Sequence, residues 1–158
     1  MALHILGTAP EISLFDSNMK AWKLSNFKNE KAVLVLFFPM AFTGVCTTEL
    51  CGVRDDIARY EQANIEVVAI SVDSVFTLAK FKSEQQYNFT LLSDFNKVVS
   101  NAYESIYPSF TDMDMQGVSK RAAFIIDKQG VIQYAEVLES AGDVPNFDAI
   151  QQKIIALA

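Results

Sequence analysis

Cysteine and histidine are nearly absent from this sequence of 158 residues, which holds two cysteines and one histidine. Cys46 and Cys51 are too few for a disulfide scaffold. A structural zinc site needs more nitrogen and sulfur ligands than these three residues supply, and a cysteine–histidine hydrolase would require His4 to fold back from the N-terminus. We therefore expect no metal and no cofactor, and we interpret His4 as a solvated terminal residue.

Long hydrophobic runs and positive charge are scarce as well. The longest apolar run, residues 32–38, is far shorter than the roughly 20 residues of a membrane-spanning helix, and residues 1–10 lack the basic region of a secretion signal. Thirteen Lys and Arg against nineteen Asp and Glu give a formal net charge of −6, which disfavours nucleic acid and anionic membrane surfaces as partners. We therefore expect a soluble, cytoplasmic protein that binds neither nucleic acid nor a membrane.

The composition favours one globular domain over residues 1–158. Apolar residues make up 51% of the chain and charged residues 20%, which excludes intrinsic disorder. The length lies within the range of about 100–200 residues that is usual for a single domain. No repeat, low-complexity stretch or linker divides the sequence.

Buried strands alternate with amphipathic helices along the chain. Unbroken apolar runs predict strands over residues 32–38 and 65–72, and apolar residues at helical spacing predict a helix over residues 47–62. The other expected elements are extended pieces at 12–15 and 21–24, a helix at 75–86, a strand at 90–92, a helix at 97–103, a hairpin of strands at 122–126 and 131–137, and a final helix at 145–157. This order predicts a mixed central β-sheet flanked by helices, an α/β fold.

The second predicted helix is expected to pack through an apolar side. The residues assigned to that side are Phe76, Leu78, Ala79 and Phe81. Asp73 or Ser74 is expected to cap its N-terminus.

The segment with the clearest chemical content follows the first buried strand and opens a helix. Cys46 falls at or near the first turn of that helix, where unsatisfied N–H groups and the helix dipole stabilise a thiolate. Pro39 and Thr43 precede it in the pattern Pro-x-x-x-Thr-x-x-Cys. A free cysteine is also commonly a small buried hydrophobe, so the residue type alone does not decide its role.

With this pattern the sequence resembles the peroxiredoxins, thiol peroxidases with a thioredoxin-like fold. Arg121, just before the predicted hairpin, adds to the resemblance, as do residues 68–73 and 91–94. The resemblance implies that Cys46 is the peroxidatic cysteine, which attacks the peroxide as a thiolate and becomes sulfenic acid. It further implies that Thr43 hydrogen-bonds the thiolate and the peroxide, that Pro39 shields the sulfur, and that Arg121 polarises both reactants.

The spacing of Cys46 and Cys51 resembles that of Q-type peroxiredoxins (bacterioferritin-comigratory-protein-like), in which the resolving cysteine lies in the same helix. Five residues along a helix separate two Cα atoms by roughly 8–9 Å, whereas a disulfide needs them within about 7 Å. Resolution by Cys51 therefore requires the helix to unwind, which the helix-weakening Gly52 favours. Gly44 stands where Q-type members commonly have a second proline, and in this the sequence resembles the AhpE-type group.

Two questions of mechanism stay open at this point. Either Cys51 forms a disulfide with Cys46 that a thioredoxin-like donor reduces, or Cys51 is a packing residue and an external small thiol resolves Cys46. The chain is expected to be a monomer or a homodimer. Glu49 either joins Arg121 or Arg54 in a polar network or acts as a first-turn carboxylate favourable to the helix dipole.

Two rival classes of function fit the residues less well. A thiol–disulfide oxidoreductase needs Cys-x-x-Cys, which the sequence lacks. A non-catalytic redoxin-like binding module would be expected to have a broken site, yet Pro39, Thr43, Cys46 and Arg121 are all present.

Overall fold

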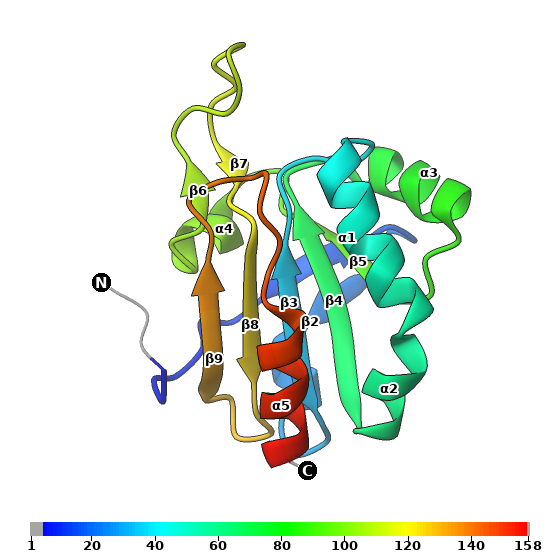
Figure 1. Ribbon diagram of the computed structural model, residues 1–158, viewed down its shortest axis with the longest axis vertical. Coiled ribbons are helices and arrows are strands. Elements are labelled where there is room, and N and C mark those ends of the chain that lie inside the picture. The colour runs from blue at the N-terminus through cyan, green and yellow to red at the C-terminus, as the bar shows by residue number, and fades with distance from the viewer. Residues whose placement is uncertain (1–4, 158) are drawn as a thin grey trace.

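A seven-stranded mixed sheet runs through the computed structural model, which describes residues 5–157 (Figure 1). The strand order is β2-β1-β5-β4-β3-β8-β9. The three central strands β5, β4 and β3 are parallel, and the outer strands join them antiparallel. Their bounds are β1 Ser13–Asp16, β2 Ala21–Lys23, β3 Ala32–Phe37, β4 Ile65–Ser71, β5 Thr90–Ser93, β8 Ala122–Ile126 and β9 Ile132–Val137. The predicted mixed α/β sheet is confirmed, whereas His4 lies outside the described residues.

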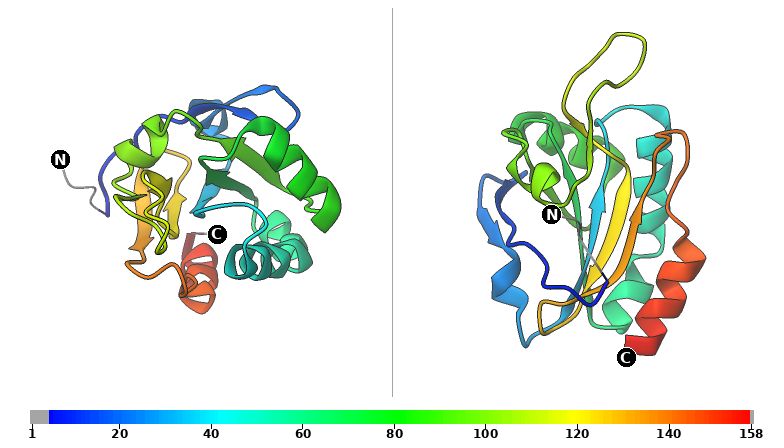
Figure 2. Two further views of the ribbon diagram at one scale, coloured as in Figure 1. Left: turned by 90° about the horizontal axis from the view of Figure 1, so that it is seen from above. Right: turned by 90° about the vertical axis from the view of Figure 1, so that its left-hand side faces the viewer.

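The strand β3 is buried along its whole length because both faces of the sheet are covered. Leu34 and Leu36 belong to the core beneath α1 (Gly44–Asp55), α2 (Ile57–Gln62) and α5 (Phe147–Leu157). The alternate residues of β3 face a second core, shared with the 3₁₀ helix η1 (Leu24–Phe27) and α4 (Val98–Ala102). Figure 2 shows α1, α2 and α5 together on one face of the sheet. No helix within residues 5–157 is long and apolar enough to span a membrane.

The register of the sheet brings distant segments to one edge. Phe37 pairs with Ala122 across the antiparallel β3–β8 contact, so the loop after β3 meets Arg121, which precedes β8. The parallel neighbour β4 ends at the same edge, where the Asp73 carboxylate accepts a hydrogen bond from the N–H of Ala41 at 2.8 Å. The chemistry-bearing residues named from the sequence therefore gather at this end of the sheet.

The helix predicted over residues 47–62 is wrong in two respects. It begins three residues earlier, at Gly44, and it is interrupted at Asp56, which divides it into α1 and α2. Asp56 has φ −102° and ψ 9°, outside the helical range, and its N–H bonds back to the carbonyls of Gly52 and Val53. The apolar spacing continues across the interruption and so does not reveal it.

One further expectation needs correction, and one pair of strands was not expected. Phe76 does not lie on the packed side of α3 (Val75–Gln85), because its side chain is 71% exposed while Leu78 and Phe81 are buried. The sequence also gave no sign of the short antiparallel pair β6 (Ile106–Tyr107) and β7 (Val118–Ser119), whose connecting loop extends beyond the rest of the molecule (Figure 1). The predicted cap of α3 is correct for Ser74, which accepts from the N–H of Thr77.

Candidate active site

Cys46 is the third residue of α1 and is completely buried. The chain enters the helix through Phe42, whose φ of +68° lies in the left-handed region, and Thr43, which is extended and occupies the N-cap position. The first helical bonds run from the N–H and the hydroxyl of Thr47 to the carbonyl of Thr43. Cys46 therefore lies within the first turn, where the N–H groups lack helical partners and favour a negative charge.

Arg121 reaches the sulfur from the neighbouring strand end. Its Nη2 donates to the Sγ of Cys46 at 3.2 Å, and its side chain is 2% exposed. Both Nε and Nη2 also donate to the carbonyl of Ala141, at 3.1 and 2.9 Å, which fixes the plane of the guanidinium. Burial lowers the pKa of Arg121, but the nearby charges of Cys46 and Glu49 outweigh it and the pKa is raised. The guanidinium is thus a permanent cation held against the sulfur.

Glu49 completes a buried row of three ionisable groups. Its Oε1 accepts from Nη1 of Arg121 at 2.6 Å, and its side chain is fully buried. Its second oxygen, Oε2, is buried without a hydrogen-bond partner among the described residues. Burial raises the pKa of Glu49 to about 7, although the charge and the hydrogen bond of Arg121 act in the opposite direction. One guanidinium therefore bridges the sulfur and a carboxyl group one helical turn away.

Thr43 and Pro39 shape the loop in front of the sulfur. The hydroxyl of Thr43 donates to the carbonyl of Met40 at 2.8 Å. Within the described chain the sulfur receives its side-chain hydrogen bond from Arg121 and not from Thr43. Since the hydroxyl proton is engaged, the lone pairs of Thr43 are available to accept a hydrogen bond from a peroxide. Pro39 is buried where the loop leaves β3.

Cys51 lies farther along the same helix and is a partly exposed free thiol. Its Sγ donates to Oε1 of Gln85 at 3.5 Å and lies 3.8 Å from the hydroxyl of Tyr87. That hydroxyl also donates to the carbonyl of Thr47, at 3.4 Å. Burial, followed by the hydrogen bond with Cys51, raises the pKa of Tyr87, so the phenol stays protonated. Cys51 is therefore packed against the segment that follows α3 and does not contact Cys46.

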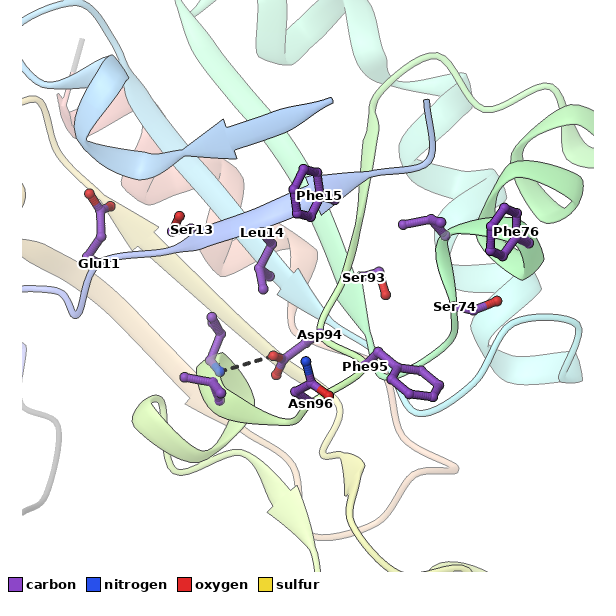
Figure 3. Close-up of a pocket in the computed structure, with 13 residues that line it drawn as sticks. Glu11, Ser13, Leu14, Phe15, Ser74, Phe76, Ser93, Asp94, Phe95 and Asn96 are labelled. Atoms are coloured by element: carbon purple, nitrogen blue, oxygen red, sulfur yellow. Dashed lines mark hydrogen bonds between the residues drawn. The ribbon is translucent and has the colours of Figure 1, made fainter. Parts of the chain in front are cut away.

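A large groove lies elsewhere. It has a volume of about 640 Å³ and lies between β1, the start of α3 and the segment after β5 (Figure 3). Asp94, its buried acid, accepts hydrogen bonds from the N–H groups of Val99 and Ser100 and so holds the start of α4. The groove contains none of the five site residues predicted from the sequence.

The structure brings Cys46 and Arg121 into contact although 75 positions separate them, and it places Pro39 and Thr43 on the adjoining loop. Glu49 was not among the site residues chosen from the sequence. Its spacing of three from Cys46 was a usable signal, because residues three apart in a helix share a face. Its partner is Arg121, whereas Arg54 instead donates to the carbonyl of Gln85 and to Asp55.

This arrangement suits nucleophilic attack by sulfur on a small electrophile. A cation touches the sulfur, the helix N-terminus adds a positive potential, and burial excludes water. Burial also means that neither a peroxide nor a thiol reaches the sulfur without displacement of the loop before α1 or of the helix start, and a bulky thiol needs the larger opening.

Known proteins resemble the chain over most of its length. The family model described as AhpC/TSA family matches residues 5–135. Alkyl hydroperoxide reductase E of Mycobacterium tuberculosis (strain ATCC 25618 / H37Rv) is 34% identical over 144 residues, which cover 90% of each chain. The chloroplastic 2-Cys peroxiredoxin BAS1 of Hordeum vulgare is 35% identical over 132 residues, which cover 79% of this chain and 60% of that protein.

Solved structures match the fold. A peroxiredoxin-like protein from Aquifex aeolicus superposes with a TM-score of 0.89 at 24% identity, over 100% of this chain and 90% of that one. The reduced 2-Cys peroxiredoxin of Plasmodium vivax superposes with a TM-score of 0.84 at 27% identity, over 98% of this chain and 81% of that one.

Proposed function

Because the chain belongs to the AhpC/TSA family, the peroxiredoxins, and is a thiol-dependent peroxidase, we propose that Cys46 is the sulfur that reduces the peroxide. The observation that carries this assignment is the 3.2 Å hydrogen bond from Arg121 to the buried Sγ of Cys46 in the first turn of α1. Within the described residues no cation donates a hydrogen bond to Cys51: its hydrogen-bond partners are an amide and a phenol, and Arg54 acts on it only through its charge.

In the proposed first step the thiolate of Cys46 attacks the terminal oxygen of the peroxide. A sulfur–oxygen bond forms, the oxygen–oxygen bond breaks, and the alkoxide or hydroxide leaves with the electron pair and takes up a proton. Arg121 stabilises the charge that moves from sulfur to the leaving oxygen. Thr43 accepts a hydrogen bond from the peroxide and orients it in line with the sulfur, and Pro39 keeps water from the thiolate.

In the proposed second step Cys51 resolves the sulfenic acid. Both cysteines belong to the intact helix α1, in which five positions separate Cα atoms by roughly 8–9 Å, too far for a disulfide. The first turns of α1 must therefore unwind before the disulfide forms with release of water. A thioredoxin-like protein is the proposed reductant, since the disulfide would be exposed by this unwinding.

A one-cysteine mechanism is the second candidate, and one observation favours it. Cys51 is held by Gln85 and Tyr87, so its thiol must leave two hydrogen-bond partners before it can react. In that mechanism an external small thiol reduces the sulfenic acid of Cys46. The reactive cysteine and the peroxide chemistry are the same in both.

Peroxide consumption by the wild type, Cys46→Ser and Cys51→Ser distinguishes these two mechanisms. We expect Cys46→Ser to consume no peroxide with any reductant. We expect Cys51→Ser to react once at near wild-type speed, to stall with thioredoxin and to convert to sulfinic acid under excess peroxide. Sustained turnover of Cys51→Ser with thioredoxin would establish the one-cysteine mechanism, and turnover by Cys46→Ser would refute the assignment of the nucleophile.

The assembly and the compartment also belong to the proposal. We propose that the chain acts as a monomer or a homodimer in the cytoplasm, where thioredoxin-like proteins and small thiols are available. Light scattering of the reduced and oxidised protein measures the oligomeric state in each. A larger oligomer in both states would contradict this part of the proposal.

A further inference from the structure

Glu49 lies where the active site meets a pocket that is partly open to the surface. One of its oxygens accepts a hydrogen bond from Arg121, and the other is buried without a partner among the described residues. Glu49 also lines a cavity of about 240 Å³ on the α5 side of α1. The other residues around this cavity are Thr48, Gly52, Val53, Asp56, Tyr60, Val144 and Phe147.

One cation in this site faces two acids. Arg121 donates to Cys46 and to Glu49, and all three groups are almost fully buried. If both acids were ionised, the buried row would carry one uncompensated negative charge, which is costly away from water. A single proton on one of the two acids balances the row. Glu49 accepts that proton readily, because burial raises its pKa to about 7.

The other ionisable groups around Glu49 do not compensate the second negative charge of the buried row. Asp56, at the cavity, has a side chain that is 55% exposed. Tyr60, also at the cavity, and Tyr107, near Arg121, both have a pKa raised by burial and stay neutral. The segment that covers the guanidinium contributes the neutral carbonyl of Ala141.

We propose that Glu49 is a positioning residue that holds one proton while Cys46 is a thiolate and releases it through the cavity when Cys46 becomes sulfenic acid. The inference rests on the proposed role of Cys46. Arg121 then faces one negative charge in each state: the thiolate before the reaction and the carboxylate after it. The guanidinium need not move, because its contact with Glu49 is retained throughout.

The proton balance of oxidation follows directly. The thiolate and the protonated Glu49 react with the peroxide ROOH to give sulfenic acid, the Glu49 carboxylate and the alcohol ROH. The leaving alkoxide takes its proton from water, and the proton from Glu49 returns to water through the cavity, so no net proton is consumed. When two reductant thiols convert the sulfenic acid back to thiolate, giving a disulfide and water, the remaining proton returns to Glu49.

Proton uptake during one oxidation measures this exchange. In a Cys51→Ser background, which stops the reaction at sulfenic acid, less than one equivalent of hydrogen peroxide is added in weak buffer with a pH indicator. Burial and Arg121 together place the pKa of Glu49 at about 7, and the neighbouring thiolate raises it further until oxidation removes that charge. We therefore expect uptake to rise from near zero just above pH 7 to near one proton per peroxide at higher pH. With Glu49→Gln added, the guanidinium has only the thiolate to neutralise, and the midpoint of this rise should fall by roughly one pH unit or more.

Glu61→Gln is the matched control, because Glu61 is exposed on α2 and its loss removes the same charge. Its midpoint should equal that of the parent protein. Equal midpoints for the parent and Glu49→Gln would overturn the inference. Mass spectrometry of the same samples keeps the proposed function separate: if Cys46 gains no oxygen, that proposal fails instead.

Infrared difference spectra test the inference without altering Glu49. Just above pH 7, where the thiolate keeps Glu49 protonated, oxidation of the Cys51→Ser protein should remove the carbonyl band of a protonated carboxylic acid and add the bands of a carboxylate. Absence of that loss would overturn the inference even if Glu49→Gln did not fold. The same band should be missing from a folded Glu49→Gln protein in both states.

Discussion

Among single residues, Arg121 carries the largest share of the proposed chemistry. Its four hydrogen bonds to Cys46, Glu49 and Ala141 use both Nη groups and Nε, so four of the five N–H donors of the guanidinium are engaged. A lysine in its place would keep the charge but lacks the planar fork that spans Cys46 and Glu49. Arg121→Lys keeps the charge but changes the positions of the donors, whereas Arg121→Ala removes both, so the two contributions can be measured separately.

We predict that Arg121→Lys slows the oxidation of Cys46 by roughly 100-fold, the usual consequence of losing a donor aimed at developing charge. Arg121→Ala should also unfold more easily, because Glu49 would remain buried without its partner. Stopped-flow kinetics with hydrogen peroxide measures the first effect. Arg59→Lys, on the exposed face of α2, is the control, and an equal rate for Arg121→Lys and wild type would contradict the role of Arg121.

The sequence names candidate residues for the site but not their contacts. Pro39, Thr43 and Cys46 follow a short pattern that can be read directly, and Arg121 was identified only because the chain resembles a known family. For Glu49 the sequence leaves a network with Arg121 or Arg54 and a first-turn carboxylate equally open, because the predicted helix begins at residue 47. The observed helix begins at Gly44, so Glu49 lies beyond the first turn and the dipole does not explain it. Its burial depends on α5 and the segment before it, which no local pattern describes.

Among the elements, α1 has the properties of a helix that can open at its start. Its N-cap residue Thr43 makes no side-chain capping bond, and the hydroxyls of Thr47 and Thr48 bond back to carbonyls four residues earlier. Such bonds slightly weaken a helix. Gly44 and Gly52 add conformational freedom. Against this stand the buried side chains of α1, which stabilise the intact helix.

We predict that Gly52→Ala slows disulfide formation without changing the first reaction with peroxide. An added Cβ meets no atom within 4 Å, so the alanine stabilises the helix by about 0.5–1 kcal/mol and should slow unwinding roughly two- to fivefold. The measurement is the rate of disulfide formation after one peroxide pulse. Ser83→Ala, exposed on α3, should leave that rate unchanged, and an unchanged rate for Gly52→Ala would argue against unwinding of α1.

Hydrogen exchange observes the same opening directly. After oxidation we expect faster amide exchange over residues 47–55, because those amides leave the helix when the disulfide forms. Residues of α5 should keep their protection. Unchanged exchange in a fully oxidised sample would show that the two cysteines are not joined through unwinding of α1.

Helices and strands were predictable from the sequence where the apolar pattern is regular. They were not predictable where contacts with neighbouring elements determine the local structure. The strands β3 and β4 follow from unbroken apolar runs. The interruption at Asp56 does not, since the apolar spacing continues across it. Phe76 is two residues from Leu78 and five from Phe81, so the helical spacing itself places it on the other side of α3, where it is exposed. The pair β6 and β7 has two residues per strand, too few for a period to be recognised.

Across the whole molecule, the buried carboxyl group of Glu49 links stability to pH. Its pKa is about 7 in the folded protein against an ordinary value of 4.5, because burial disfavours the carboxylate. Between pH 4.5 and about pH 7 the folded chain binds a proton that the unfolded chain does not, so raising the pH lowers the free energy of unfolding. Above pH 7 this destabilisation is complete. It lowers the free energy of unfolding by about 3 kcal/mol relative to a glutamate whose pKa is the same in the folded and unfolded chain.

We therefore predict that the stability difference between the reduced wild type and Glu49→Gln depends on pH. Relative to the variant, the wild type should lose about 2–3 kcal/mol between pH 5 and pH 8. Urea unfolding of both proteins at the two pH values gives this difference. A constant difference across that range would show that Glu49 is ionised in the folded protein throughout.

The most direct test of the central claim is to locate the oxygen that one equivalent of peroxide leaves on the protein. Wild type and Cys51→Ser are treated with the peroxide, trapped with a reagent for sulfenic acid and mapped by mass spectrometry. The account predicts a trapped sulfenic acid on Cys46 in Cys51→Ser and a disulfide between Cys46 and Cys51 in the wild type. A trapped sulfenic acid on Cys51 with Cys46 unmodified would contradict it.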